Sequence, residues 1–503
     1  MSGTRFVVGT TRNLGKRNRR VAGVVAAALL VGVGASGFPA SAVSAAVEAV
    51  RDDFNGDGYS DLVVSAPGGT VSGQEGAGYV AVLYGGGSGL SGARRATFSL
   101  STPGIPGVAQ AGDGLGQVTA SGDLDGDGYA DLVVGMPGRD VGATADAGAA
   151  VVLWGSAGGL QTGGALWLQD DVPAARGRFG MGLATGRFNG AGIELATLDR
   201  DGVATYAFAF AAGGGRTPEG AVPVDWEWRE GFTPTGLTSG DYNNSGSDDL
   251  VVLGTLTIYE GIHPMETVGA ASYFTGGRDG LTYGRGLAGG PVGASGDINN
   301  DGYADLVFGS PADSDDLNEW LLDGGTVDVF FGGPSGPDTR EGASQHWSQT
   351  TVGASGDDAN GDRFGGAVTV GDVNGDGYAD AAIGAPANDI NNLTDPGTVW
   401  VMRGTANGLT PRGLASFSQS TPSVPGDNED NDRFGGALRL IDANRDGRAE
   451  LVASAPGEDT GDGAAWVFPG TSNGPTGTGS WSFNGATLSA PVPDARFGET
   501  LAP

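Results

Sequence analysis

Clusters of acidic side chains recur along the chain, each just before a run of valine, leucine and alanine. In "DFNGDGYSDLVVSAPG", which begins at Asp53, oxygen-bearing side chains stand at loop positions 1, 3, 5 and 9, and glycine stands at position 6. Carboxylates this close repel one another unless a cation lies between them. Oxygen donors at alternate positions of a glycine-bent loop suit Ca²⁺, which accepts flexible geometry. The pattern therefore predicts calcium-binding loops.

Six copies of this loop keep enough oxygen donors to bind calcium, and in five of them the backbone carbonyl of position 7 is expected to be a further ligand. The predicted ligands, loop by loop, are Asp53, Asn55, Asp57, Tyr59 and Asp61; Asp123, Asp125, Asp127, Tyr129 and Asp131; Asp241, Asn243, Ser245 and Asp249; Asp297, Asn299, Asp301, Tyr303 and Asp305; Asp372, Asn374, Asp376, Tyr378 and Asp380; and Asp442, Asn444, Asp446, Arg448 and Glu450. Weaker binding is expected where the neutral Ser245 occupies position 5. We expect five to six structural Ca²⁺ ions.

The alternative is that each D-x-N-G-D-G stretch is only a tight turn. An additional acid at position 9 in five near-identical copies favours calcium, because a turn alone does not need it. An EF-hand would place a bidentate glutamate at position 12 on a helix, but position 12 is Val134, inside a β-run. A seventh copy has Arg187 at position 1 and Ala191 at position 5, so with Asn189 it is not expected to bind a cation.

The loops belong to a larger repeating unit with one internal order. A Phe-Gly or similar pair opens each unit, a short apolar strand leads into the loop, and a second strand such as "ADLVVG" ends near an Ala-Pro pair. A third strand and a fourth follow, as at 150–155 and 165–170. Four strands per unit, repeated seven times, predict an all-β fold, a seven-bladed β-propeller of four-stranded antiparallel blades.

The two ends of the chain hold complementary parts of one unit. The unit with Asp53 has no Phe-Gly strand before it, whereas the chain ends in "RFGETLAP" with no acidic loop after it. The C-terminal Phe-Gly strand, Arg496 to Ala502, is therefore predicted to join the Asp53 blade. That pairing closes the ring and leaves no free sheet edge at the seam.

This pattern resembles the FG-GAP repeat, in which Phe-Gly precedes an Asp-x-Asp-x-Asp-Gly-x-x-Asp loop and a Gly-Ala-Pro. The stretch "DRFGGAVTVGDVNGDGYADAAIGAP" at 362–386 matches almost position for position. The chain is similar over about residues 50–503 to the propeller head of integrin α subunits and to secreted bacterial FG-GAP proteins. The resemblance implies Ca²⁺ in β-hairpin loops, and a ligand-facing surface formed by the opposite loops. Leg domains and an inserted domain are not expected, so the integrin adhesion role does not follow.

The N-terminal region differs in composition from the repeats. Six basic residues precede an uncharged run from Val21 to Phe38, and Ala40-Ser41-Ala42 or Val43-Ser44-Ala45 offers a cleavage site, so residues 1–45 are predicted to be a secretory signal peptide. The alternative is a membrane anchor, but the apolar run is short and rich in glycine and alanine. The pair Arg19-Arg20 permits a twin-arginine route. Residues 46–503 are predicted to form the propeller. No second apolar run is long enough to span a bilayer, so we expect a secreted, extracellular protein without a membrane span.

Charge and composition exclude several classes of function. The chain has 59 acidic and 27 basic residues, a net charge of −32, and no cysteine. Without residues 1–42, which carry six of the basic residues, the charge becomes −38. Such a chain does not bind nucleic acid or anionic lipid by charge. Cysteine catalysis is excluded, and the missing disulfides make calcium a plausible source of stability.

Residues that could carry catalysis or ligand contact are few. The two histidines, His263 and His346, lie in irregular stretches and are interpreted as surface residues. The acidic turns at 357–362 and 427–432 are not explained by the calcium loops and are interpreted as solvated. Trp154, Trp400 and Trp466 occupy third strands and are expected in the core. Trp320 lies in an expanded acidic loop and is a candidate ligand contact, with local packing as the alternative.

The sequence therefore favours a monomeric binding or adhesion scaffold for an extracellular protein or glycan over an enzyme. The alternative is a secreted propeller enzyme that acts on polysaccharide, a lyase or a glycoside hydrolase, because 59 acids offer many carboxylate pairs. Fold alone does not decide between the two.

Overall fold

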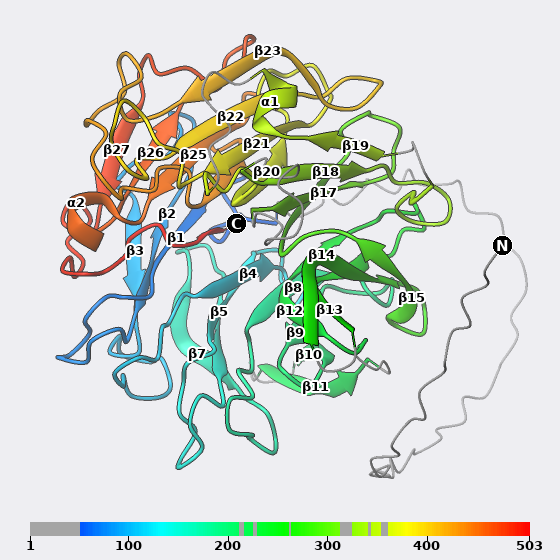
Figure 1. Cartoon of the computed structure of the whole chain (residues 1–503). Helices are drawn as coiled ribbons and strands as arrows, with labels where there is room; N and C mark the ends of the chain where they lie inside the picture. The colour runs from blue at the N-terminus through cyan, green and yellow to red at the C-terminus, as the bar shows by residue number, and fades with distance from the viewer. Residues whose placement is uncertain are drawn as a thin grey trace, which may run out of the picture. The chain divides into compact units, whose positions relative to one another are not determined.

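Seven four-stranded antiparallel sheets make up the described part of the chain (Figure 1). The computed structural model describes residues 51–210, 216–224, 229–260, 263–311, 324–340, 344–353 and 361–502. All of them belong to one compact unit, Ala49–Pro503. The predicted all-β, seven-bladed β-propeller is thus confirmed. The predicted signal peptide and Trp320 lie outside the described residues.

Every blade has the same antiparallel order of strands from the ring axis outward. Blades 1 to 4 consist of β28 (Leu501–Ala502), β1 (Leu62–Ala66), β2 (Tyr79–Leu83) and β3 (Arg95–Phe98); β4 (Val118–Gly122), β5 (Asp131–Met136), β6 (Ala149–Trp154) and β7 (Gln161–Leu168); β8 (Gly182–Gly186), β9 (Glu194–Leu198), β10 (Val203–Phe210) and β11 (Arg216–Pro223); and β12 (Phe232–Gly240), β13 (Asp249–Glu260), β14 (His263–Thr275) and β15 (Thr282–Ala288).

Blades 5 to 7 consist of β16 (Val292–Gly296), β17 (Asp305–Ser310), β18 (Thr326–Phe330) and β19 (Ser344–Trp347); β20 (Ala367–Gly371), β21 (Asp380–Ala385), β22 (Thr398–Arg403) and β23 (Thr410–Phe417); and β24 (Leu438–Ile441), β25 (Glu450–Ala455), β26 (Ala464–Phe468) and β27 (Trp481–Asn484). Two one-turn helices lie in the connections, α1 (Gln349–Val352) and α2 (Glu458–Gly461).

The innermost strands contact one another in a closed sequence. Each of β4, β8, β12, β16, β20 and β24 contacts the next, and β28 contacts both β24 and β4. The acidic loops follow the C-terminal ends of these inner strands. A Phe-Gly or Leu-Gly pair precedes the N-terminal ends of β4, β8, β20, β24 and β28, whereas Phe232 begins β12 and Gly289-Gly290 precedes β16. The ring therefore has an acidic-loop face and a Phe-Gly face.

Blade 1 takes its inner strand from both ends of the chain. Strand β28 pairs with β1 through Val63↔Ala502 and Val64↔Leu501, which confirms the predicted closure. The strand is shorter than the predicted Arg496 to Ala502, because Phe497-Gly498 forms a corner before it. The position beyond Ala502 is filled from the N-terminal side, where Asp52 O accepts from Asp61 N at 2.8 Å. Figure 1 shows the C-terminus beside β1.

The Phe-Gly pairs of blades 1, 3, 6 and 7 join each of these blades to the one before it. Phe364 N donates to Gly324 O of blade 5 at 2.7 Å, whereas Gly365 N donates to Gly384 O of its own blade at 3.0 Å. The Phe364 ring is fully buried and lies 5.6 Å from the Trp400 ring. Gly365 has φ 85°, and a Cβ there would lie 2.6 Å from Thr326 O, so only glycine fits this corner.

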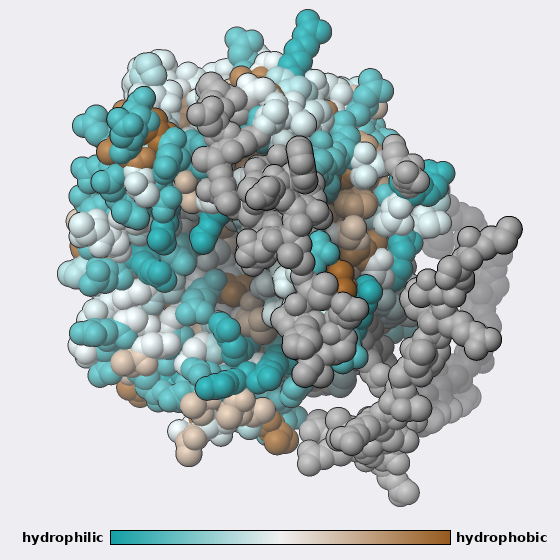
Figure 2. All heavy atoms as spheres, viewed as in Figure 1, coloured by the Kyte–Doolittle hydropathy of each residue, from teal (hydrophilic) through white to brown (hydrophobic). Residues whose placement is uncertain are grey.

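The core is spread through the ring in the second and third strands. Strands β1, β2, β5, β6, β21 and β25 are buried along their whole length, because neighbouring blades cover both faces. That is why they read as continuous apolar runs instead of alternating ones. Trp154, Trp400 and Trp466 are at most 2% exposed, as predicted. The face in Figure 2 is mainly hydrophilic, with hydrophobic residues in small separate groups.

Deleting residues 494–503 should cost far more than an ordinary C-terminal trim. The deletion removes the buried Ala495, Phe497 and Leu501 and exposes the edge of β1. We expect loss of soluble monomer, measured by size-exclusion chromatography. The milder Phe497→Ala should lower the free energy of unfolding by ~3–5 kcal/mol.

The matched control for Phe497→Ala is Val108→Ala, because Val108 is 72% exposed and should change stability by less than ~0.5 kcal/mol. A truncated chain that stays monomeric and melts like the full-length protein would contradict closure through β28.

Candidate calcium sites

The aspartate at loop position 1 folds the loop around itself. Its two carboxylate oxygens accept backbone N–H groups from the far side of the turn: Asp297 Oδ1 from Asp301 at 3.0 Å, and Oδ2 from Gly302 at 2.9 Å. The same pair of bonds recurs at Asp53, Asp123, Asp241 and Asp442. At Asp372 the bonds come from Gly375 and Gly377. Six loops therefore share one conformation.

The side chains at positions 3 and 5 face the same turn. Asn299 Oδ1 accepts from Asp301 N at 3.0 Å, and Asp301 Oδ1 accepts from Tyr303 N at 3.0 Å. Equivalent bonds occur in the loops that begin at Asp53, Asp123, Asp372 and Asp442. Each carboxylate or amide oxygen keeps a second lone pair, so a cation could bind without breaking the turn. The position-7 carbonyls remain predicted ligands.

The carboxylate at position 9 has a structural role that the sequence did not reveal. Asp305 Oδ2 accepts from Ile298 N at 2.9 Å, and Oδ1 accepts from Gly332 N at 2.8 Å, beyond the third strand. Asp61, Asp131 and Asp380 make the same two bonds in their blades. All four side chains are 0% exposed. The ninth acid therefore ties the loop to its blade whether or not an ion is bound.

Burial of this carboxylate is expensive while it is charged. Burial raises the pKa of Asp305 to about 7 and that of Asp61 to about 7, although their backbone hydrogen bonds oppose the shift. The pKa of Asp131 rises to about 8 and that of Glu450 to about 7, again mainly through burial. Neighbouring acids of the same loops add to the rise. A divalent cation would offset both effects and keep these groups ionised.

The side chains of these loops offer carboxylate and amide oxygens, which are the kind of ligand that Ca²⁺ prefers. Asp123, Asp125 and Asp131 each offer an oxygen within 4.8 Å of the others, close enough to share one ion. In this loop Arg216 of blade 3 also contacts Asp125 and Asp127, the latter at 3.0 Å. Arg94, Arg403 and Arg448 lie 3.3–3.6 Å from acids of three other loops. Arginines thus supply part of the positive charge that these loops need.

The blade 3 loop forms the same kind of turn without the acids. Asn189 Oδ1 accepts from Ala191 N at 2.8 Å, and Glu194, at position 8, accepts from Asn189 N at 3.0 Å. Arg187 N donates to Asp248 Oδ2 at 2.8 Å. The turn therefore does not itself require a metal, and this loop is an internal control for the other six.

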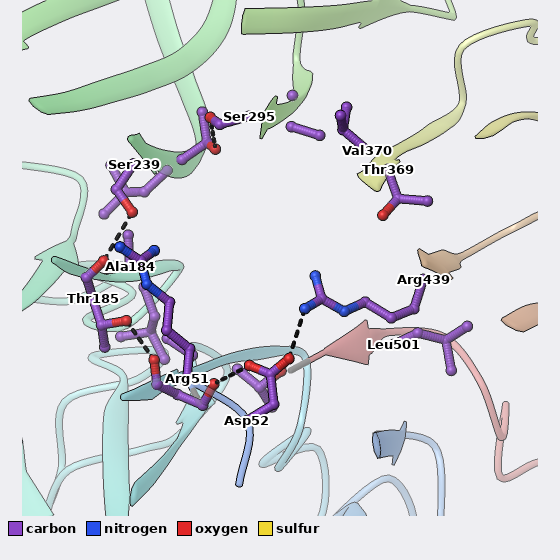
Figure 3. Close-up of a pocket in the computed structure, with 18 of the residues that line it drawn as sticks. Arg51, Asp52, Ala184, Thr185, Ser239, Ser295, Thr369, Val370, Arg439 and Leu501 are labelled. Carbon is purple, nitrogen blue, oxygen red and sulfur yellow. Dashed lines mark hydrogen bonds and ion pairs between the residues drawn. The ribbon is translucent and has the colours of Figure 1, made fainter. Parts of the chain in front are cut away.

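A cavity of about 470 Å³ lies on the ring axis, lined by residues of the inner strands (Figure 3). Its hydroxyl groups link neighbouring blades: Ser239 Oγ donates to Thr185 O at 2.8 Å, and Thr238 Oγ1 lies 3.1 Å from Ser295 Oγ. At one side Arg439 pairs with Asp52 at 2.9 Å, as Figure 3 shows. These groups form hydrogen bonds and an ion pair with residues of neighbouring blades, and they therefore help to hold the blades together.

The remaining candidates have mixed outcomes. His346 is a surface residue as predicted, with 59% of its side chain exposed, but it lies in strand β19 instead of an irregular stretch and pairs with Asp328 at 2.8 Å. Nothing is described for the side chain of His263. The interpretation of 427–432 as a solvated turn holds for Asp427 and Asp430 and is wrong for Asp432, which is 1% exposed. Its carboxylate accepts a hydrogen bond from Glu429 N, within the same turn. The same interpretation of 357–362 is wrong for Asp362, which is 2% exposed, and residues 357–360 lie outside the described residues.

Comparison with known proteins gives one family and partial relatives. The FG-GAP repeat family matches residues 47–83, 115–153, 364–402 and 434–468. Phosphatidylinositol-glycan-specific phospholipase D of Rattus norvegicus is 33% identical over 167 residues, which are 32% of this chain and 18% of the relative. Integrin alpha-IIb of Mus musculus is 36% identical over 117 residues, 22% of this chain and 11% of the relative. The chain thus spans less than a fifth of either relative.

Among solved structures, Chaetomium thermophilum Sqt1 is similar with a TM-score of 0.40 and 13% identity, over 75% of this chain and 73% of that chain. In the described residues, no helix is long and apolar enough to cross a membrane. The matched repeats coincide with blades whose Phe-Gly corners and acidic loops share one geometry. Four stretches of this chain match the FG-GAP repeat, and they lie within a seven-bladed propeller.

Proposed function

We propose that this protein is a secreted, calcium-loaded propeller that binds an extracellular protein or glycan. The observation that carries the proposal is the shared conformation of the acidic loops. In six of them backbone N–H groups hold the carboxylate of position 1, and in five they also hold the oxygens of positions 3 and 5, as in the loop of Asp297. Secretion is supported by the sequence of residues 1–45. Calcium at extracellular concentration would then be part of the folded state.

The stabilisation expected from calcium is large enough to matter. With ~1 mM Ca²⁺ and a Kd of ~0.1 mM, one site adds about 1.4 kcal/mol. Several such sites would compensate for the absence of disulfides in a secreted chain. In the six blades with acidic loops, the ions would link the inner strand to the second strand and leave the Phe-Gly face free for a ligand.

Binding is favoured over catalysis by the residues at hand. His346, with its partner Asp328, lies on the exposed surface of the outer strands β18 and β19, away from the ring axis. The integrin relative supports a binding role, and the phospholipase relative is named as an enzyme, but the chain covers 11% and 18% of their lengths. An enzyme that acts on polysaccharide is the alternative function.

The purified protein should bind a glycan or cell-wall preparation in a calcium-dependent manner and without turnover. A binding screen with and without chelator measures the first part, and an assay for released sugar ends measures the second. Release of reducing or unsaturated sugar ends would favour the alternative enzyme.

Chelation should lower the melting temperature markedly at pH 7.5, and Ca²⁺ should restore it better than Mg²⁺. The loops are all oxygen donors and do not impose the octahedral geometry that Mg²⁺ demands. An unchanged melting curve in excess chelator would contradict bound calcium.

The chelator effect should also depend on pH. The ion-free position-9 carboxyls have pKa values raised to about 6–8, so their stabilising contribution is complete below pH ~4 and is lost as pH rises through those values. Calcium binding needs the ionised groups and fades as pH falls. The gap between melting temperatures with and without Ca²⁺ should therefore widen from pH 5 to pH 8. A constant gap would place the ions elsewhere.

Asp301→Asn should remove one bound ion and weaken the calcium-dependent rise in melting temperature. The amide keeps the oxygen that accepts from Tyr303 N but removes a charge from the loop. Asp127 is less suitable, because it also pairs with Arg216. Asn189→Ala in the blade 3 loop is the control and should leave the ion count unchanged. Native mass spectrometry counts the ions; equal losses in both variants would contradict the assignment.

A further inference from the structure

Three blades bury an aspartate just before the Phe-Gly corner, on the face opposite the acidic loops. Asp113, Asp362 and Asp432 are each at most 2% exposed. In two of them the carboxylate closes a local turn: Asp113 Oδ2 accepts from Gln110 N at 2.8 Å, and Asp432 Oδ2 accepts from Glu429 N at 2.7 Å. A buried carboxylate needs a further partner for its charge.

The partner comes from one position, the second residue after the Pro that follows the second strand. In blade 2 it is Arg139, whose guanidinium lies 2.8 Å from Asp113 Oδ2. In blade 6 it is Asn388, whose Nδ2 donates to Asp362 Oδ2 at 2.9 Å. The built-in partner is thus a cation in one blade and a neutral donor in another.

In blade 7 the same position is Glu458, so a second carboxyl group stands where Arg139 stands in blade 2. A third side chain, Gln419, joins the two acids. Its Nε2 donates to Glu458 Oε2, and it also contributes a hydrogen bond to Asp432. Gln419 is 1% exposed, and its Oε1 has no hydrogen-bond partner in the described part of the protein. The cluster therefore lacks a positive charge and leaves a buried oxygen unpaired.

The surroundings add negative charge to this cluster. Glu429 and Asp459 both raise the pKa of Glu458 further, after burial and Asp432, which are the larger causes. Glu458 itself is only partly buried, so the cluster opens to solvent. An ion from solution can reach the position that the Arg139 guanidinium fills in blade 2.

We propose that Asp432, Glu458 and Gln419 form a further cation site, between blades 6 and 7 on the Phe-Gly face, which binds Ca²⁺. Two carboxylates and an amide oxygen are hard donors, and their charge of −2 matches a divalent ion. Rotation of the Gln419 carboxamide turns its unpaired Oε1 toward the ion and its Nε2 away. Solvent supplies the remaining ligands, as is usual for an exposed site.

The blade series supports a cation over a shared proton. Blade 2, which has the internal cation Arg139, has the apolar Leu100 at the position of Gln419, whereas blade 6 has Gln349, which is 3% exposed. The amide thus occurs only where the internal cation is missing in these three blades. A site that merely shared a proton would not need an additional buried oxygen donor.

The test counts calcium in the intact protein by native mass spectrometry at saturating Ca²⁺. Glu458→Gln, which keeps the shape of the side chain, should lose one ion relative to the parent chain. Glu458→Arg, which copies blade 2, should also lose one ion and should raise the melting temperature in chelator. The control is Glu499→Gln, an exposed acid paired with Arg496, which should keep the full count.

An unchanged ion count in Glu458→Gln would overturn the proposal, and the pair would then share a proton. If the parent chain and Glu458→Gln both bind no calcium, the acidic loops fail to bind as well, and the proposed function is contradicted together with this site. Because Glu458→Gln leaves those loops intact, failure at this site and failure of the calcium loops give different counts.

Discussion

A buried carboxylate at the ninth loop position holds each acidic loop to its blade. Through Asp305, for example, one side chain joins the loop to the backbone beyond the third strand, so that three strands meet at one ionisable group. The same burial that makes these bonds strong makes the charge costly. Calcium would remove that cost, and the stability of the blade and the occupancy of the loop then depend on each other.

Neighbouring blades are joined by corners and side chains of modest size. The Phe-Gly pairs of blades 1, 6 and 7 bond backward to the previous blade and forward to their own, and axial hydroxyls bridge adjacent inner strands. Such links act in series around a closed ring, so loss of any one exposes two blade faces. The seam in blade 1 depends on the shortest strand, β28, and on Asp52, which also pairs with Arg439 of blade 7.

Much of the fold was predictable because it repeats. The order of four strands, the closure by the C-terminal strand and the buried tryptophans all follow from patterns that recur seven times. What escaped prediction lies between repeats or occurs once. Arg216 reaches the Asp123 loop from 91 residues away in sequence. Asp52 extends the inner edge of blade 1 by accepting a hydrogen bond from Asp61 N, but no Phe-Gly pair precedes it to mark that position.

The acidic turn at 427–432 shows the same limit in the candidate sites. Nothing local distinguishes Asp432 from its exposed neighbours; only the packing of the Phe-Gly corner buries it. Its partner Glu458 comes 26 residues later by sequence number, after the two strands β24 and β25. A motif search examines each loop separately. The charge around a buried carboxylate depends on the side chains of a second loop that packs against it, and local sequence does not reveal that contact.

Comparing equivalent positions in several blades recovers that balance. The same buried aspartate meets arginine in blade 2, asparagine in blade 6 and glutamate in blade 7. The blade that supplies its own cation needs nothing from solution, and the blade that adds a second acid needs the most. When equivalent positions in a ring of repeats carry a cation in one blade and an anion in another, the blade with the anion needs a positive charge from solution. An external ion is therefore expected at that position.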